Sequence, residues 1–308
     1  MVRRKLYLPA LLGPLVAAVL MACAAAVVVS KEAEATFPGK NGRIANNSQG
    51  VIYTINPNGT GKFKVTNTRV GGYNIDYSPD GKKITYTSYE GFNDGNPTGP
   101  QKDTEIYTIN VDGSAKTNVT NNDRGDEDSS YSPDGKRIAY AGWDGHDLEI
   151  YTIGVHGKNR VRLTNNATND GYPDYSPNGK KIAAWSEKGQ YIYTISVHGG
   201  GKSKVVKGSD PSYSPDGKRI AYTGRRFFER DSEIYTIDVN GRHRTKVTNN
   251  NATEYWPSYS PDDKKIAFIR GRGRNPDIYT KNVDSGGESK KVTGSRSIWS
   301  NPSWGSRA

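Results

Sequence analysis

Short runs in which large apolar residues alternate with smaller or polar ones return along the chain from about residue 40 onwards. Ile84 and Tyr86 flank a threonine, Ile138 and Tyr140 flank an alanine, and the same spacing recurs after Ile220 and Ile266. A period of two is typical of β-strands, and Gly, Pro, Asn and Asp between the runs are typical of turns. The pattern predicts an all-β protein made of many short strands.

Two strings recur along these segments. Ile-Tyr-Thr returns with steps of 54, 44, 42, 42 and 44 residues, its tyrosines being Tyr53, Tyr107, Tyr151, Tyr193, Tyr235 and Tyr279. Tyr-Ser-Pro-Asp-Gly-Lys, or a close variant, returns with steps of 54, 44, 38 and 46 residues, starting at Tyr77, Tyr131, Tyr175, Tyr213 and Tyr259. A period of roughly 40 residues indicates a repeat architecture in which each unit is one supersecondary element.

Each repeat predicts four strands. The Tyr-Ser-Pro strand leads into a Ser-Pro-Asp-Gly turn, then come the alternating strand and the Ile-Tyr-Thr strand, and after a second tight turn a short basic strand such as residues 161–164. Proline presets φ in the first turn and glycine supplies the positive φ at its end. Asp263 replaces that glycine in the last repeat, which is acceptable because Asp enters the left-handed region more easily than most residues.

The count of strands predicts a closed ring. The first unit starts at Gly42 with its second strand, while residues 300–305, 45 residues after the preceding motif, look like an isolated first strand. Radial stacking of four-stranded sheets buries faces that one sheet cannot bury alone. We therefore predict one domain, a six-bladed β-propeller over residues 37–308, closed by the C-terminal strand pairing into the N-terminal blade.

The repeats resemble PD40 repeats, the WD40-like propeller repeats of the TolB family. The matching segments are residues 77–82, 131–136, 175–180, 213–218 and 259–264, and residues 36–42 are similar to the start of many secreted propellers of this kind. TolB itself carries an α/β domain ahead of its propeller, for which this sequence leaves no room. The resemblance thus implies the propeller fold and its general use as a protein-binding platform.

Residues 1–35 have the features of a targeting segment. Arg3, Arg4 and Lys5 precede 24 uncharged residues, and a small-x-small site ends at Ala35. Three interpretations stay open: a cleaved signal peptide, an uncleaved membrane anchor, or a bacterial lipoprotein acylated at Cys23. All three predict an extracytoplasmic protein, whether secreted, periplasmic or held at the cell surface.

Composition narrows the chemistry. One cysteine excludes a disulfide-stapled scaffold, and four histidines form no cluster at zinc-ligand spacing. No Gly-x-Ser-x-Gly nucleophile motif occurs. We predict no catalytic residues, metal or cofactor, although weak enzymatic activity stays open. The net charge of +11 permits contact with anionic glycans, but an exported protein rarely meets nucleic acid, so we expect none.

The tight turns of every repeat share one face of the ring, here called the turn face. The remaining connections vary and share the opposite face, here called the variable face, where function is expected. At the channel mouth on that face we expect acidic and aromatic residues to bind a partner. The candidates are Tyr73, Asp126, Asp128, Asp170, Tyr172, Asp210, Glu254, Trp256 and Trp299.

Two variable loops are further candidates: residues 224–230 combine cations with two adjacent phenylalanines, a combination typical of partner contacts, and residues 269–274 form a basic tip. The candidate residues are Arg225, Arg226, Phe227, Phe228 and Arg272. The run at residues 123–128 superficially resembles a calcium loop, but it lacks the alternating ligand spacing, and we interpret it as a solvated turn. We predict a monomer that binds a protein or peptide; the alternative is a propeller that binds or cleaves a glycan.

Overall fold

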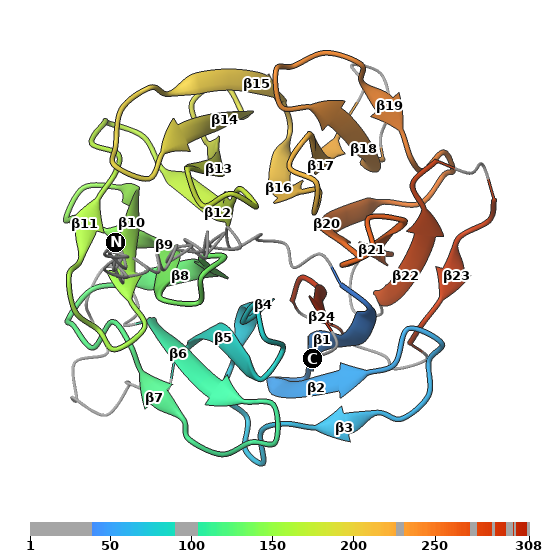
Figure 1. The fold of residues 1–308 in the computed structure, drawn as a ribbon, viewed down its shortest axis with the longest axis horizontal. Coiled ribbons are helices and arrows are strands. Elements are labelled where there is room, and N and C mark those ends of the chain that lie inside the picture. Colours follow the sequence, from blue (N-terminus) through green and yellow to red (C-terminus); the bar gives the residue numbers. More distant parts are fainter. Residues whose placement is uncertain are drawn as a thin grey trace, which may run out of the picture. The chain divides into compact units, whose positions relative to one another are not determined.

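The computed structural model describes residues 39–89, 104–225, 231–271, 276–284, 287–293, 298 and 300–306. These residues belong to one compact unit, residues 32–308. They form 24 strands in six four-stranded antiparallel sheets. The sheets surround a central axis as the blades of a propeller (Figure 1). The predicted all-β, six-bladed fold is confirmed.

Each blade has the same strand order from the axis outwards. The innermost strands are β24 (Ser303–Ser306), β4 (Tyr73–Tyr77), β8 (Asp126–Tyr131), β12 (Asp170–Tyr175), β16 (Ser209–Tyr213) and β20 (Glu254–Tyr259) for blades one to six. The second strands are β1 (Asn41–Ser48), β5 (Lys83–Ser88), β9 (Arg137–Trp143), β13 (Lys181–Ser186), β17 (Arg219–Gly224) and β21 (Lys265–Arg270). The third strands are β2 (Val51–Ile55), β6 (Glu105–Asn110), β10 (Leu148–Gly154), β14 (Tyr191–Ser196), β18 (Glu233–Asp238) and β22 (Asp277–Asn282). The outer strands are β3 (Phe63–Lys64), β7 (Thr117–Asn118), β11 (Val161–Arg162), β15 (Ser203–Lys207), β19 (Thr245–Lys246) and β23 (Lys290–Lys291).

The turn after each innermost strand is held by its own side chains. In blade two, the Asp80 carboxylate accepts hydrogen bonds from the Ser78 hydroxyl at 2.6 Å and from the Lys82 amide at 3.0 Å. Gly81 follows with φ of 66°, and Asp263, its counterpart in blade six, has φ of 61°. The Ser-Pro-Asp-Gly string therefore encodes the turn locally, as its sequence predicts.

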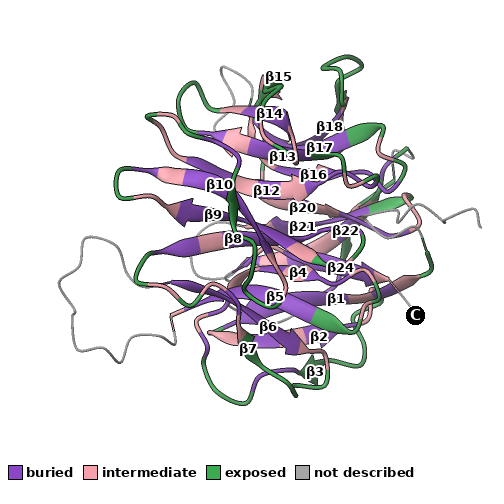
Figure 2. Cartoon of the chain, turned by 60° about the vertical axis from the view of Figure 1, so that its left-hand side comes forward, coloured by how far each residue is buried: buried purple, intermediate pink, exposed green. Residues whose placement is uncertain are grey.

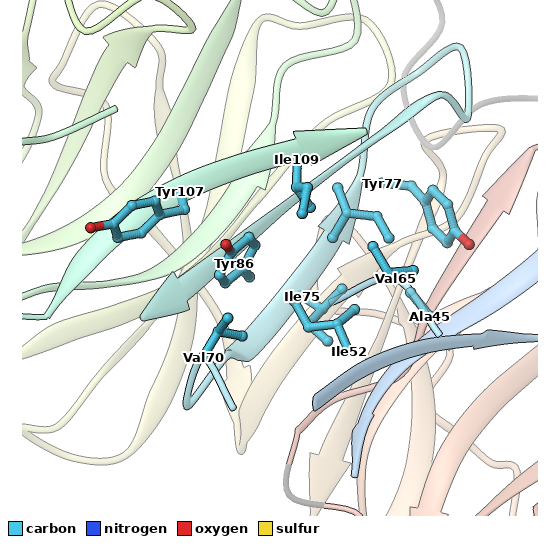
Figure 3. Packing of buried hydrophobic residues seen from close by; sticks show 10 residues of the cluster. Ala45, Ile52, Val65, Val70, Ile75, Tyr77, Tyr86, Tyr107 and Ile109 are labelled. Atoms are coloured by element: carbon cyan, nitrogen blue, oxygen red, sulfur yellow. The ribbon is translucent and has the colours of Figure 1, made fainter. Parts of the chain in front are cut away.

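The hydrophobic core lies between neighbouring blades rather than within one. Ala45 and Ile52 of blade one pack with Ile75 and Tyr86 of blade two, and all four are 0% exposed (Figure 3). Exposed residues concentrate in the connections and outer strands (Figure 2). A single repeat would leave both faces of its sheet in water, so each blade depends on its neighbours for stability.

A basic residue just before each of five outer strands covers a third-strand tyrosine. Arg160 lies 4.0 Å from the ring centroid of Tyr151, and Lys202 lies 3.8 Å from that of Tyr193. Lys62, Lys116 and Arg244 make the same contact with Tyr53, Tyr107 and Tyr235. In blade six, Arg270 of β21 covers Tyr279 instead. A cation over an aromatic ring is stabilising, which explains why the outer edge of the repeat is basic.

Close to the axis, a hydrogen bond links each blade to the next. The residue that makes this bond with its side chain stands directly before the tyrosine of each Tyr-Ser-Pro motif, or before Trp304 in blade one. We call these tyrosines and Trp304 the motif aromatics. Asp76 accepts from the Tyr131 amide at 2.9 Å and Asp174 from the Tyr213 amide at 2.6 Å. The hydroxyls of Ser212, Ser258 and Ser303 accept from the amides of Tyr259, Trp304 and Tyr77, and the Ser130 hydroxyl donates to Asp174. All six junctions are bridged. We call the six residues directly before the motif aromatics the axial belt: Asp76, Ser130, Asp174, Ser212, Ser258 and Ser303.

The ring closes in blade one, where the first and last described segments share a sheet. Strand β24 pairs with β1 through Ile44 opposite Trp304 and Ala45 opposite Ser303. Trp304 is buried, 4% exposed, in a core cluster shared with blade six. The predicted closure by the C-terminal strand is therefore confirmed.

The described residues contain no helix long and apolar enough to cross a membrane.

Removing the closing strand tests how much stability depends on it. Deleting residues 298–308 should lower the free energy of unfolding by roughly 3 kcal/mol or more, because it removes a buried tryptophan and leaves the edge of β1 unpaired. Urea denaturation and size-exclusion chromatography measure the effect. Deleting only residues 307–308 is the control and should change neither. Equal stability of the two deletion proteins would contradict closure by β24.

Candidate functional site

Five innermost strands carry a β-bulge three residues before the motif aromatic. In blade four, Gly171 pairs with Trp185 and Asp174 with Ala183, so two residues of β12 oppose one of β13. The residues at the bulge have positive φ without being glycine: Asn74 (55°), Asp128 (59°), Tyr172 (51°), Asp210 (56°) and Trp256 (56°). Such a conformation is costly for a large aromatic, and strain of this kind clusters at functional sites.

The bulge residues are anchored across blade junctions. Asp128 accepts a hydrogen bond from the Tyr172 amide at 3.1 Å and another from the Asn74 side chain. The Trp256 amide donates to Thr223 of blade five at 3.2 Å. These bonds hold the bulges in register with one another, so the side chains that project from them have defined positions.

Acidic residues gather near the axis at two levels. Asp76 and Asp174 belong to the axial belt, while Asp128 and Asp210 occupy the bulges. Burial raises the pKa of Asp76 to about 6, and burial together with the charge of Asp76 raises that of Asp174 to about 8. Burial and the neighbouring Glu127 carboxylate also raise the pKa of Asp128, and burial raises that of Asp210. Each carboxyl thus holds its proton more firmly than in water.

Asp126, Asp170 and Glu254, expected at the channel mouth, lie between blades and are 0% exposed. Asp126 accepts from the Asn122 side chain at 2.6 Å, while Glu105 of blade two accepts from the Asn122 amide at 2.7 Å. The same arrangement joins Glu149, Asn166 and Asp170, and again Glu233, Asn250 and Glu254. These three carboxylates have no exposed surface with which to contact a partner. We leave them out of the proposed binding surface.

The structure of the acidic run at residues 123–128 also differs from what its sequence predicts. It was predicted as a solvated turn, but its second half begins strand β8, where Asp126 and Asp128 are 0% and 6% exposed. Burial raises the pKa of Asp126 to about 7. The reason is that the bulge and the blade junction enclose these carboxylates, which the local sequence alone does not show.

A cavity of about 590 Å³ opens on the variable face between blades four, five and six. We call it the mouth pocket. Its lining includes Trp185, Gln190, Lys207, Asp210, Arg225, Tyr255 and Trp256. The rings of Tyr255 and Trp256 meet edge to face with centroids 5.0 Å apart, and Tyr172 meets Trp185 in the same manner at 6.1 Å. The pocket thus combines aromatic surfaces with one carboxylate and two cations.

Three of the predicted site residues, Asp210, Arg225 and Trp256, line this pocket, and Tyr172 borders it through Trp185. Tyr73 lies on the blade-two side of the axis and bonds the hydroxyl of Tyr89. Arg226, Phe227, Phe228, Arg272 and Trp299 lie outside the described residues.

Sequence reasoning missed Trp185, although a signal was present. The second strands of blades two, three, five and six have their aromatic two residues after the isoleucine, at Tyr86, Tyr140, Tyr222 and Phe268. Blade four has Ala184 there and Trp185 one residue later. A shift of one residue moves a side chain to the opposite face of a strand, so this tryptophan turns away from the position that its counterparts occupy.

The repeated sheets and closure define a β-propeller of the PD40 type. The model of the TolB beta propeller domain family, PD40, matches residues 51–226 and 206–308. The chain therefore belongs to this family, as the sequence motifs predict.

Among solved structures, TolB from Acinetobacter baumannii has a TM-score of 0.70 at 20% identity, covering 86% of this chain and 67% of that one. The putative TolB from Agrobacterium tumefaciens has a TM-score of 0.67 at 18% identity, covering 85% and 93%. A chain of a nidogen/laminin complex has a TM-score of 0.67 at 9% identity, covering 86% and 99%. These likenesses establish the fold. No curated protein sequence matches the chain.

The raised pKa values near the axis predict that stability falls as pH rises. A carboxyl with a higher pKa in the folded state binds more protons than in the unfolded state, so the free energy of unfolding decreases between the unfolded and folded pKa values. For Asp174 that interval runs from 3.8 to about 8. We expect a loss of about 1 kcal/mol or more between pH 5 and pH 8, since residual exposure moderates the effect.

Chemical denaturation at both pH values measures this loss. Asp174→Asn should reduce it, because the amide does not ionise. Asp134→Asn is the matched control, since Asn178 already occupies the same turn position in blade four, and it should keep the loss. An Asp174→Asn protein whose stability has the same pH dependence as that of the unchanged protein would contradict the attribution of this loss to Asp174.

Proposed function

We propose that this protein is an extracytoplasmic, non-catalytic propeller that binds a protein or peptide at the variable face of the ring. The observation that carries the proposal is the mouth pocket, a cavity of about 590 Å³ with Trp185, Tyr255 and Trp256 in its lining. All three are partly buried, and aromatic groups that line a concave site are typical of interface hot spots.

The charges of the pocket suit a peptide with both polar and apolar groups. Asp210 offers an acceptor to an amine or guanidinium, while Lys207 and Arg225 at the rim offer donors to a carboxylate or a main-chain carbonyl. Tyr255 and Trp256 offer faces for an apolar or cationic side chain.

The propeller family supports a binding role rather than naming a ligand. TolB-like propellers bind proteins in general, and a similarly folded chain occurs in a nidogen/laminin complex. We extend this use to the present chain, with the ligand left at the level of a protein or peptide. The variable loops that contain Arg226, Phe227, Phe228 and Arg272 are proposed as further contacts.

We also propose that residues 1–35 direct export and that the propeller domain begins at about residue 37. The basic start, the uncharged stretch and the small residues around Ala35 support this division. An extracytoplasmic location agrees with the cysteine-free propeller, which needs no reducing compartment.

A glycan is the second candidate ligand. Aromatic faces beside a carboxylate, as Trp256 and Tyr255 are beside Asp210 in the mouth pocket, also suit a sugar ring and its hydroxyls. A glycan array and a reducing-sugar assay on the purified protein separate the two candidates, because a peptide-binding platform responds in neither.

The binding proposal predicts where affinity is concentrated. Ligands selected from a displayed peptide library should bind the unchanged protein, and Trp185→Ala or Trp256→Ala should each weaken binding by about 2 kcal/mol, since both remove an aromatic wall of the pocket. Calorimetric titration measures the loss. Lys136→Ala and His198→Ala on the turn face are the controls. Turn-face variants that weaken binding more than the tryptophan variants would contradict the choice of face.

The export proposal predicts a mature protein that starts at Thr36 and is found outside the cytoplasm. Mass spectrometry of the native protein after cell fractionation measures its N-terminus. A mass that includes diacylglyceryl-Cys23 would establish the lipoprotein interpretation, and an intact N-terminus in the membrane fraction would establish the anchor.

A further inference from the structure

Three carboxylates meet in the connection between β9 and β10 of blade three. Asp144, Asp147 and Glu149 each bring one oxygen to within 4.8 Å of the others. The side chain of Asp144 is 11% exposed, while Asp147 and Glu149 are 8% and 0% exposed as residues. Three negative groups are therefore crowded at a place where little water reaches them.

Only part of this charge is balanced within the described residues. Arg162 places Nη2 2.6 Å from an oxygen of Asp144 and 2.9 Å from one of Glu149. A second guanidinium, that of Arg124, donates to the main-chain carbonyl of Asp144 at 2.8 Å. Two cations thus stand against three carboxylates, and a net negative charge remains. The other oxygen of Asp144 accepts from the amides of His146 and Asp147.

Asp147 stands apart from its two neighbours. Its Oδ1 is buried and has no hydrogen-bond partner among the described residues. A buried carboxylate oxygen without a donor is costly, and natural structures rarely keep one unless an ion or water completes it.

The same position in blade five supplies a comparison inside the chain. Asp231, two residues before Glu233 as Asp147 is before Glu149, accepts a hydrogen bond from the Thr253 hydroxyl at 3.3 Å. In blade three, Asn169 replaces that threonine, and its side chain is engaged with the Leu148 amide and with Glu187. Blade three therefore lacks the donor that satisfies the aspartate of blade five.

We propose that Asp144, Asp147 and Glu149 bind a hard divalent cation, with Ca²⁺ the best fit. All three ligands are carboxylate oxygens, which calcium prefers, and a surface connection tolerates its flexible geometry better than the strict octahedron that Mg²⁺ requires. The ion would balance the remaining negative charge and give the buried Oδ1 of Asp147 a partner. It would fix the β9–β10 connection on the variable face. The sequence suggested no metal, because these ligands follow no known spacing.

The test uses the full-length protein after removal of metal by chelation. Trp143 precedes Asp144 directly, so Tb³⁺ bound at the site should emit when the indole is excited, and Ca²⁺ should displace it. Calcium titration should give a dissociation constant in the range of roughly 10⁻⁴ to 10⁻³ M, typical of extracellular modules, and should raise the melting temperature.

Asp147→Asn should weaken calcium binding at least tenfold and abolish the calcium-dependent rise in melting temperature. It should fold without metal, since its Oδ1 has no hydrogen bond to lose, and its melting temperature under chelation shows this. Asp231→Asn is the matched control and should bind calcium like the unchanged protein. Absence of Tb³⁺ and Ca²⁺ binding to the unchanged protein at millimolar concentration, or equal binding by the Asp147→Asn protein, would overturn the proposal.

Discussion

One hydrogen bond at each blade junction, close to the axis, is the constraint around which this propeller is built. The motif aromatic lies in the innermost strand, which pairs with another strand of its sheet on one side only. A side chain from the preceding blade accepts the hydrogen bond of its amide at five of the six junctions. A short acceptor must therefore stand just before each motif aromatic, and the chain uses only Asp or Ser there. The acidic character of the axis follows in part from this structural need rather than from ligand binding.

The repeat period made the fold predictable from sequence, because the turn residues, the alternating strands and the recurring strings all indicate the same four-stranded repeat. Serine, proline, aspartate and glycine encode the turn within six residues, and the missing first strand of the first repeat indicates where the ring closes. Local chemistry and global topology point to one answer, which is the condition under which a sequence can be interpreted without a structure.

The candidate site was predictable only where a side chain acts within its own strand. Trp256 and Asp210 could be chosen because they lie three residues before the motif tyrosine, which places them in the innermost strands. Asp126 could not be assigned correctly, because its burial depends on Asn122 and on Glu105 from the preceding blade. Trp185 shows the opposite case, since its position was visible as a one-residue shift but its consequence depends on which neighbouring blade each face of β13 meets.

Strand β24 also sets the order in which the molecule can be made. Blades two to six each consist of contiguous segments and are complete before the ribosome reaches residue 303, whereas blade one keeps its innermost edge open until the last strand has been synthesised. Blades four and five can pack as soon as their strands have been synthesised, but the ring cannot close before residues 303–306 have been added. Blade one is therefore the last blade to be completed, although its other three strands are synthesised first.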